Sequence, residues 1–272
     1  MADFRKKPSW REENLVVETP LHTLMSPLVI TAHVFYPEFA TKLINSLKKL
    51  PQETKVYATT SSLEIKHKLI EYFETAGNPH DVRLTPNIGR NFGPLLNEFS
   101  KELLKEESFI HVHSKRSPHS PNFSKIWLKR NTDLLLTPRG VQRISSIIDS
   151  NINIGLVYAD STDLLRGINF RWGRSLNAGK NLLSHMTGFE GVKWSGRLSF
   201  PSGGMFWVKT VAITPLLEFP WEYEFFPEEI GQVDGALHHS LERVIGELVL
   251  ARKWKHAVYL EGIDRFVLKS DV

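Results

Sequence analysis

The sequence predicts an α/β fold in which helices flank a mostly parallel central sheet. Three observations support this prediction: short strand patterns alternate with helical patterns between residues 28 and 113, the connections between them are short, and no repeat or low-complexity linker divides the 272-residue chain,. Such alternation favours parallel strands joined by right-handed crossovers. We expect residues 1–26 to form an N-terminal arm and residues 27–272 a single domain.

The first half of the chain carries the clearest elements. An apolar run at 28–35, bounded by prolines, predicts a buried strand, and apolar residues at helical spacing predict a helix over 38–50,. The next elements are expected in this order: a strand at 55–60, a helix at 62–75 with Ser62 as its N-cap, a strand at 82–85, a loop at 87–94 entering a helix that ends near residue 105, and a strand at 109–113,.

The second half is less regular. Residues 154–159 predict a strand, residues 200–208 a loop running into another strand, and residues 234–251 a helix,. Residues 161–199 combine many Arg, Asn, Gly and Trp residues with weak periodicity, which favours a long functional loop region,.

Composition excludes several classes of protein. With 41% hydrophobic and 24% charged residues the chain has the balance of an ordinary globule rather than of a disordered segment,. It contains no cysteine, which excludes disulfides, thiol nucleophiles and cysteine-ligated zinc,. A net charge of +4 is small for a nucleic-acid-binding protein and equally suits an anionic small molecule or membrane face,.

The predicted location is the cytoplasm. The apolar stretches are too short to span a bilayer, and the polar, mixed-charge N-terminus does not read as a signal peptide,. Phe4 and Trp10 lie among basic residues in the arm, so contact with the cytoplasmic face of a membrane is an alternative to a poorly ordered terminus,.

Functional groups of parallel sheets gather beyond the carboxyl ends of the strands. Six polar residues fall at such ends in the predicted order: His33, Tyr36, Thr59, Thr60, His113 and Lys115. From Ser108 to Thr132 the chain has no acidic residue but several basic ones, Arg116 among them, which suits phosphate,. A solvated basic loop around one buried histidine is the alternative, and a site in which histidines bind a metal lacks a nearby carboxylate.

Two glycine-containing segments are candidate ligand loops. In the first, the backbone around Asn87 and Gly89, together with Arg90, is placed to hold an anionic or ribose-bearing ligand at a helix N-terminus,. In the second, Gly203 and Gly204 permit close backbone approach, and Trp207 offers a face for stacking on a sugar,. The alternatives are ordinary turn glycines and a core tryptophan beside a tight turn.

Asp234 is the candidate general base. It is predicted at the start of the last helix, where the helix dipole keeps a carboxylate ionised, and His238 follows one turn later on the same face,. A simple N-cap is the alternative, and the two roles are compatible.

Together these segments resemble the rhamnan synthesis protein F family, whose members are associated with assembly of bacterial O-antigen, capsule and cell-wall polysaccharides. The resemblance runs from about residue 28 to about residue 246 and rests on these motifs: Ala-His-Val-Phe-Tyr-Pro at 32–37, Asn-Ile-Gly-Arg-Asn-Phe-Gly-Pro at 87–94, His-Ser-Lys-Arg-Ser at 113–117, Phe-Pro-Ser-Gly-Gly-Met-Phe-Trp at 200–207, and Asp-Gly at 234–235 followed by His239 and Glu242-Arg243.

The resemblance implies a GT-A-like glycosyltransferase with a Rossmann-type sheet. Many such enzymes hold a divalent metal with an Asp-x-Asp motif after the fourth strand, where this chain has His-Val-His-Ser-Lys at 111–115. We therefore expect cationic groups to stabilise the leaving diphosphate without metal or other cofactor. Asn91 departs from the family, whose members usually carry Asp there, and is consistent with the alternative of a non-catalytic protein of the same fold.

The implied reaction is inverting transfer of a sugar, rhamnose by the family's name, from a nucleotide diphosphate to a growing surface polysaccharide. The expected catalytic residues are Asp234, His113 and Lys115, and the expected substrate-binding residues are His33, Thr59, Thr60, Asn87, Gly89, Arg90, Asn91, Arg116, Gly203, Gly204, Trp207 and His238. The expected partners are the donor and a lipid-linked or polysaccharide acceptor, with peripheral inner-membrane association as an option. A degenerate binding protein of the same fold is the alternative, and no nucleic-acid-binding module is recognised.

Overall fold

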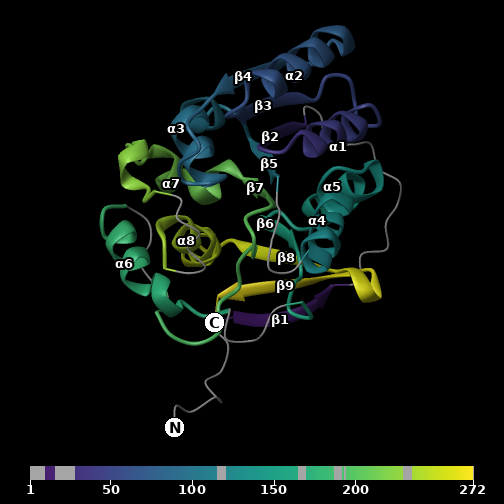
Figure 1. Ribbon diagram of the computed structural model, residues 1–272. Coiled ribbons are helices and arrows are strands. Elements are labelled where there is room, and N and C mark those ends of the chain that lie inside the picture. The colour runs from purple at the N-terminus through teal and green to yellow at the C-terminus, as the bar shows by residue number, and fades with distance from the viewer. Residues whose placement is uncertain are drawn as a thin grey trace.

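The computed structural model of the chain describes residues 10–15, 28–114, 121–164, 170–186, 192, 194–228 and 235–271. Within these ranges nine strands form one sheet in the order β1-β9-β8-β6-β7-β5-β2-β3-β4 (Figure 1). The strands are β1 (Trp10–Leu15), β2 (Val29–His33), β3 (Lys55–Thr60), β4 (His80–Leu84), β5 (Ser108–His113), β6 (Ile154–Ala159), β7 (Phe206–Lys209), β8 (Lys255–Leu260) and β9 (Arg265–Asp271).

Helices connect the strands along the chain. The α-helices are α1 (Pro37–Leu47), α2 (Leu63–Ala76), α3 (Phe92–Leu103), α4 (Pro121–Leu135), α5 (Pro138–Ser150), α6 (Leu176–Ser184), α7 (Thr214–Glu218) and α8 (Leu237–Ala251). Short 3-10 turns are η2 (Gly173–Ser175), η3 (Thr210–Ile213), η4 (Tyr223–Phe225) and η5 (Glu261–Ile263). None of the helices in the described ranges is long and apolar enough to cross a bilayer.

Two hydrophobic cores fill the two faces of the sheet. One core packs α1, α2, α4 and α5 against the sheet, and the other packs α3, α6, α7 and α8 against the opposite side (Figure 1). We call these sides the α1 face and the α8 face. Strand side chains alternate between them, so strands such as β2, β5 and β8 contribute to both cores,.

The predicted fold class, an α/β domain with a mostly parallel sheet, is confirmed, and the sheet is mixed. Strands β3, β2 and β5 pair in parallel, β7 runs antiparallel between β5 and β6, and β6 pairs in parallel with β8. The carboxyl ends of β2, β3, β5, β6 and β8 therefore lie along one edge of the sheet. We call this the carboxyl edge.

The element predictions are accurate where the local pattern is strong. The strands at 55–60 and 154–159 have the predicted bounds, and Ser62 caps α2 by accepting a hydrogen bond from the Ile65 N–H. The last helix begins at Leu237, three residues after its predicted start, with Ala236 at the N-cap position.

Other elements were not predicted. Within the expected arm, β1 pairs antiparallel with β9 at the edge of the sheet. The region 161–199, expected as a long loop, contains η2 and α6, and the segments that form α4, α5, β8 and β9 carried no prediction.

Candidate functional site

The carboxyl ends of three neighbouring parallel strands place three predicted site residues side by side. In the sheet register His33 of β2 lies opposite both Thr59 of β3 and His113 of β5. The residue before each of them in its strand belongs to the core of the α1 face. Because strand side chains alternate, all three side chains lie on the α8 face, at the carboxyl edge.

His33 is a buried, neutral member of this group. Its Nδ1 is 2.9 Å from the Thr59 hydroxyl, and its Nε2 has no hydrogen-bond partner among the described residues. Burial, together with the nearby His113, lowers the pKa of His33 to about 3,. Thr60 has a local role, since its hydroxyl accepts from the Ser62 N–H at the start of α2.

A second polar layer lies two residues earlier in the same strands. The Thr31 hydroxyl donates to the Ile110 carbonyl at 3.2 Å and lies 2.8 Å from Nδ1 of His111. The Asn91 amide nitrogen lies 3.1 Å from Nε2 of the same ring. An amide N–H donates, so Nε2 accepts and Nδ1 carries the proton. Burial lowers the pKa of His111 well below its usual range, in agreement with a neutral ring.

His113 makes two contacts that call for protons on both ring nitrogens. Its Nδ1 is 2.8 Å from the Ser114 carbonyl oxygen, and its Nε2 is 2.6 Å from the Gly203 carbonyl oxygen. A carbonyl oxygen only accepts, so both contacts are hydrogen bonds only when the ring is an imidazolium. The geometry therefore favours a buried positive charge at the carboxyl edge.

His111 and His113 are not suited to bind a divalent metal ion. Both ring nitrogens of His111 and of His113 are already engaged with protein groups, so no lone pair is left for a metal ion. In the part of the chain that the structure describes, no three His, Asp or Glu side chains come together as a metal-ligand set.

The glycine turn before β7 is packed tightly against its neighbours. Gly203 and Gly204 have φ of +87° and +75°. A Cβ at Gly203 would lie 2.0 Å from the ring of Trp127, and one at Gly204 would lie 2.8 Å from the Asn91 amide. The close approach that these glycines permit is thus to protein. Trp207, only 2% exposed, lies in the core of the α1 face, which agrees with the alternative of a core tryptophan.

Helix α8 joins the glycine turn to the loop before α3. The Gly203 N–H donates to Glu242 Oε2 at 3.2 Å, and Nη1 of Arg90 lies 3.4 Å from Nε2 of His239. His238, on the same helix, is 2% exposed. His239 and Glu242 lie three residues apart, so a single turn of α8 contacts both loops,. Neither was among the predicted site residues, although both belong to the motif that begins with Asp-Gly at 234–235.

The loop before α3 holds two consecutive left-handed residues. Gly89 has a φ of +73° and Arg90 a φ of +52°, a conformation that costs a non-glycine residue free energy,. Asn87 in the same loop is exposed. Asn91 occupies the N-cap position of α3 but makes no capping hydrogen bond with its side chain, which contacts His111 instead.

Three predicted residues, Lys115, Arg116 and Asp234, lie outside the described residues. Their immediate neighbours along the chain are well defined at one end of each gap: Ser114 follows β5, and Gly235 precedes α8. The predicted roles of these three residues stay predictions.

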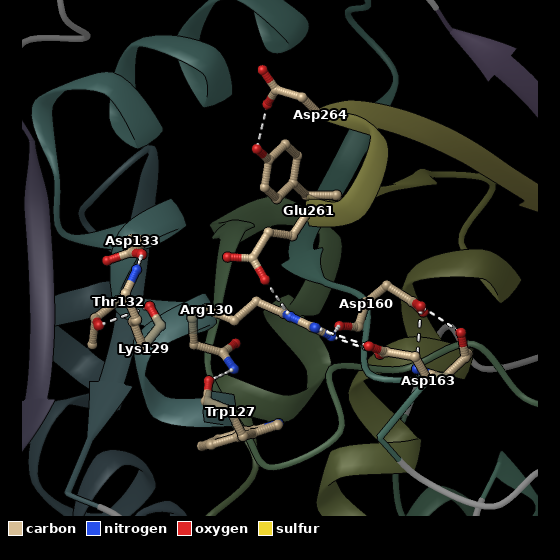
Figure 2. Close-up of polar contacts among 12 residues, drawn as sticks. Trp127, Lys129, Arg130, Thr132, Asp133, Asp160, Asp163, Glu261 and Asp264 are labelled. Atoms are coloured by element: carbon tan, nitrogen blue, oxygen red, sulfur yellow. Dashed lines mark hydrogen bonds and ion pairs between the residues drawn. The ribbon is translucent and has the colours of Figure 1, made fainter. Parts of the chain in front are cut away.

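The positive charge expected across residues 108–132 is partly neutralised. Arg130 pairs with Asp163 at 2.7 Å and with Glu261 at 3.0 Å, and Lys129 pairs with Asp133 (Figure 2). These two basic side chains of the segment are therefore paired with carboxylates that lie after residue 132 in the sequence.

Comparisons with known proteins extend the motif resemblance. Residues 12–254 match the family described as rhamnan synthesis protein F, RgpF. Proteins named WxcX, described as uncharacterized, from two strains of Xanthomonas campestris pv. campestris are each 26% identical over 220 residues, covering 80% of this chain and 30% of the relative. The chain thus spans less than a third of these relatives. The structure of S. aureus TarS 1–349 matches with a TM-score of 0.47 and 14% identity, covering 88% of this chain and 59% of that one.

Proposed function

This chain belongs to the rhamnan synthesis protein F family, and from that premise we propose that it transfers a sugar from a nucleotide-diphosphate donor to a growing bacterial surface polysaccharide. The observation that carries the proposal is His113, whose two hydrogen bonds to carbonyl oxygens favour a fixed imidazolium at the carboxyl edge. Ligands of open α/β sheets bind outside this edge. A positive charge there suits a diphosphate leaving group.

The transfer needs a base and a stabilised leaving group. Asp234 removes the proton from an acceptor hydroxyl, whose oxygen attacks the anomeric carbon while the bond to the donor diphosphate breaks, which inverts the configuration. His113 uses both ring N–H groups on protein carbonyls, so it acts on the diphosphate through its charge,. Direct hydrogen bonds to the departing oxygens are assigned to Lys115 and Arg116.

No metal takes part in this mechanism. The engaged ring nitrogens of His111 and His113 support that choice, as does the absence of carboxylates from the segment that replaces Asp-x-Asp. The sugar is proposed to be rhamnose or a related pyranose, and the acceptor to be lipid-linked or a polysaccharide at the cytoplasmic face of the inner membrane.

The donor's nucleotide is assigned to the α8 face of the carboxyl edge. His33 supports this assignment, because its buried Nε2 has no hydrogen-bond partner among the described residues,. Arg90 supports it as well, since a left-handed arginine stores strain that functional loops commonly hold,.

Release of nucleoside diphosphate from a panel of sugar nucleotides tests the proposal. Asp234→Asn is expected to lower turnover by at least about 100-fold, the range typical of general-base catalysis, with donor affinity kept. Lys115→Ala is expected to weaken nucleoside diphosphate binding instead. Wild-type turnover in Asp234→Asn would assign the base to another residue, with His238 the first to test.

A non-catalytic sugar-nucleotide-binding protein is the second candidate. It is favoured by Asn91, which places an amide against His111 where family members usually carry a carboxylate. Donor binding without turnover for any sugar nucleotide in the panel would support this candidate over the transferase.

A further inference from the structure

A cavity of about 260 Å³ lies between α4, α5 and the end of β8. Its polar lining includes Arg130, Asp133, Arg139, Arg143, Tyr259 and Glu261. Pockets for drug-sized ligands usually measure about 300–1,000 Å³, so this cavity suits one small ring. It contains none of the residues assigned to the donor.

The cavity lies on the same edge of the sheet as His113. Tyr259 is near the carboxyl end of β8, and Arg130 donates to the carbonyl of Asp160, which follows β6, at 2.9 Å. Helix α4 connects the two places. Trp127 of α4 packs against Gly203. Arg130 lies three residues further along the same helix (Figure 2). Three residues correspond to an axial rise of about 4.5 Å.

The arginines of the cavity are held by carboxylates. Arg130 is bound by both Asp163 and Glu261, and this pairing raises its pKa. Its side chain is 11% exposed. An anionic ligand would have to displace these carboxylates or share the arginine with them, at a cost in repulsion. The charge balance of this side disfavours phosphate.

The opposite wall is compensated in the same way. Arg143 donates to the Tyr259 hydroxyl at 2.8 Å and pairs with Asp264, to which Tyr259 also donates. Burial and the bond to Asp264 raise the pKa of Tyr259 to about 12, so the hydroxyl stays protonated. Arg139, with a side chain 78% exposed, makes a longer pair of 3.5 Å to Asp264.

Hydrogen-bonding capacity remains in spite of these pairs. A guanidinium has five N–H donors and a carboxylate about four acceptor positions. Arg139, Asp133 and Glu261 are all at least 42% exposed at the side chain, so donors and acceptors face solvent together. A neutral polyol can use both kinds of group without leaving a charge unpaired.

We propose that this cavity is a subsite for one uncharged sugar residue of the acceptor glycan. The proposal rests on the proposed glycosyl transfer, because the cavity lies on the α1 face at the same carboxyl edge to which the donor is assigned. Arg139, Glu261 and Asp133 would bind ring hydroxyls, and Arg130 and Arg143 hold the walls.

Calorimetric titration of uncharged trisaccharides of rhamnose, mannose and glucose tests the subsite. Wild-type protein should bind at least one of them, and the double variant Arg139→Ala with Glu261→Gln should bind it at least ten-fold more weakly. Arg139→Ala alone removes a largely exposed side chain and should give a smaller loss in a folded protein. The matched control is Arg265→Ala with Glu224→Gln, which changes two exposed residues outside the cavity and should leave affinity unchanged.

Nucleoside diphosphate is titrated into the same proteins, so that the two proposals are judged separately. Its affinity should be equal in all of them. Equal trisaccharide affinity in the double variant and wild type would overturn the subsite, and so would binding of none of the trisaccharides by wild type. Inorganic pyrophosphate is titrated as well. If the double variant loses affinity for pyrophosphate but not for the trisaccharide, the cavity is an anion site and the sugar subsite is overturned. Trisaccharide binding that depends on the cavity, without turnover of any donor, would keep a glycan site and overturn the transferase.

Discussion

Gly203→Ala should destabilise the protein strongly, because two separate effects act at one atom. At a φ of +87° a side chain costs about 1–2 kcal/mol,. The added methyl group would lie 2.0 Å from the Trp127 ring, and overpacking of this kind costs typically about 1–3 kcal/mol,. The reduced entropy of the unfolded chain returns about 0.4–1 kcal/mol. The net loss in free energy of unfolding is therefore about 1–5 kcal/mol.

Urea denaturation followed by far-UV circular dichroism measures this loss. Gly262→Ala is the matched control, since a Cβ there has no heavy atom within 4 Å, and its effect should stay within about 0.5 kcal/mol,. A shift in the free energy of unfolding for Gly203→Ala no larger than that for Gly262→Ala would refute this prediction. Such a result would mean that the turn is not wedged between α4 and α8 as described.

Three further predictions concern pH, strain and the amide at Asn91. His33 and His256 are buried and have pKa values of about 3, so below pH 6.5 the unfolded chain binds more protons than the folded one,. Their contribution to stability is therefore fully present above pH 6.5 and is lost as the pH falls, by on the order of 4 kcal/mol at pH 5,. An unchanged urea midpoint between pH 7.5 and 5 would contradict this. Arg90→Gly should stabilise the fold by up to about 1 kcal/mol, because it relieves the left-handed φ, and should weaken donor binding,. Unchanged donor affinity in a calorimetric titration would show that Arg90 is not part of the site. Asn91→Asp should raise the pKa of His111 by placing a carboxylate at Nε2, and NMR titration of the ring would show no such rise if the side chains do not touch,.

The first half of the fold was predictable because its signals are local. Strand β3 and helix α2 follow directly from a short buried run and from the N-cap at Ser62. Strand β1 could not be found in this way. Its sequence, Trp-Arg-Glu-Glu-Asn-Leu, has no apolar alternation, and its backbone pairs with β9 at the far end of the chain.

The candidate site was predictable only as far as parallel strands align their ends. That rule places His33 and His113 together, as the register shows,. The contacts that define the protonation states of these rings come from tertiary packing. One example is the contact between His113 and the Gly203 carbonyl, 90 residues away in sequence. The same limit applies to Arg130 in the basic segment 108–132. Its charge is paired with Asp163 and Glu261, which lie 33 and 131 residues further along the chain.

Nucleoside diphosphate release by the wild-type protein, assayed across sugar nucleotides with and without EDTA, tests the central claim most directly. We expect turnover with at least one donor at a rate that EDTA leaves unchanged, because His113, Lys115 and Arg116 supply the positive charge. Complete loss of turnover in EDTA, restored by manganese, would contradict it.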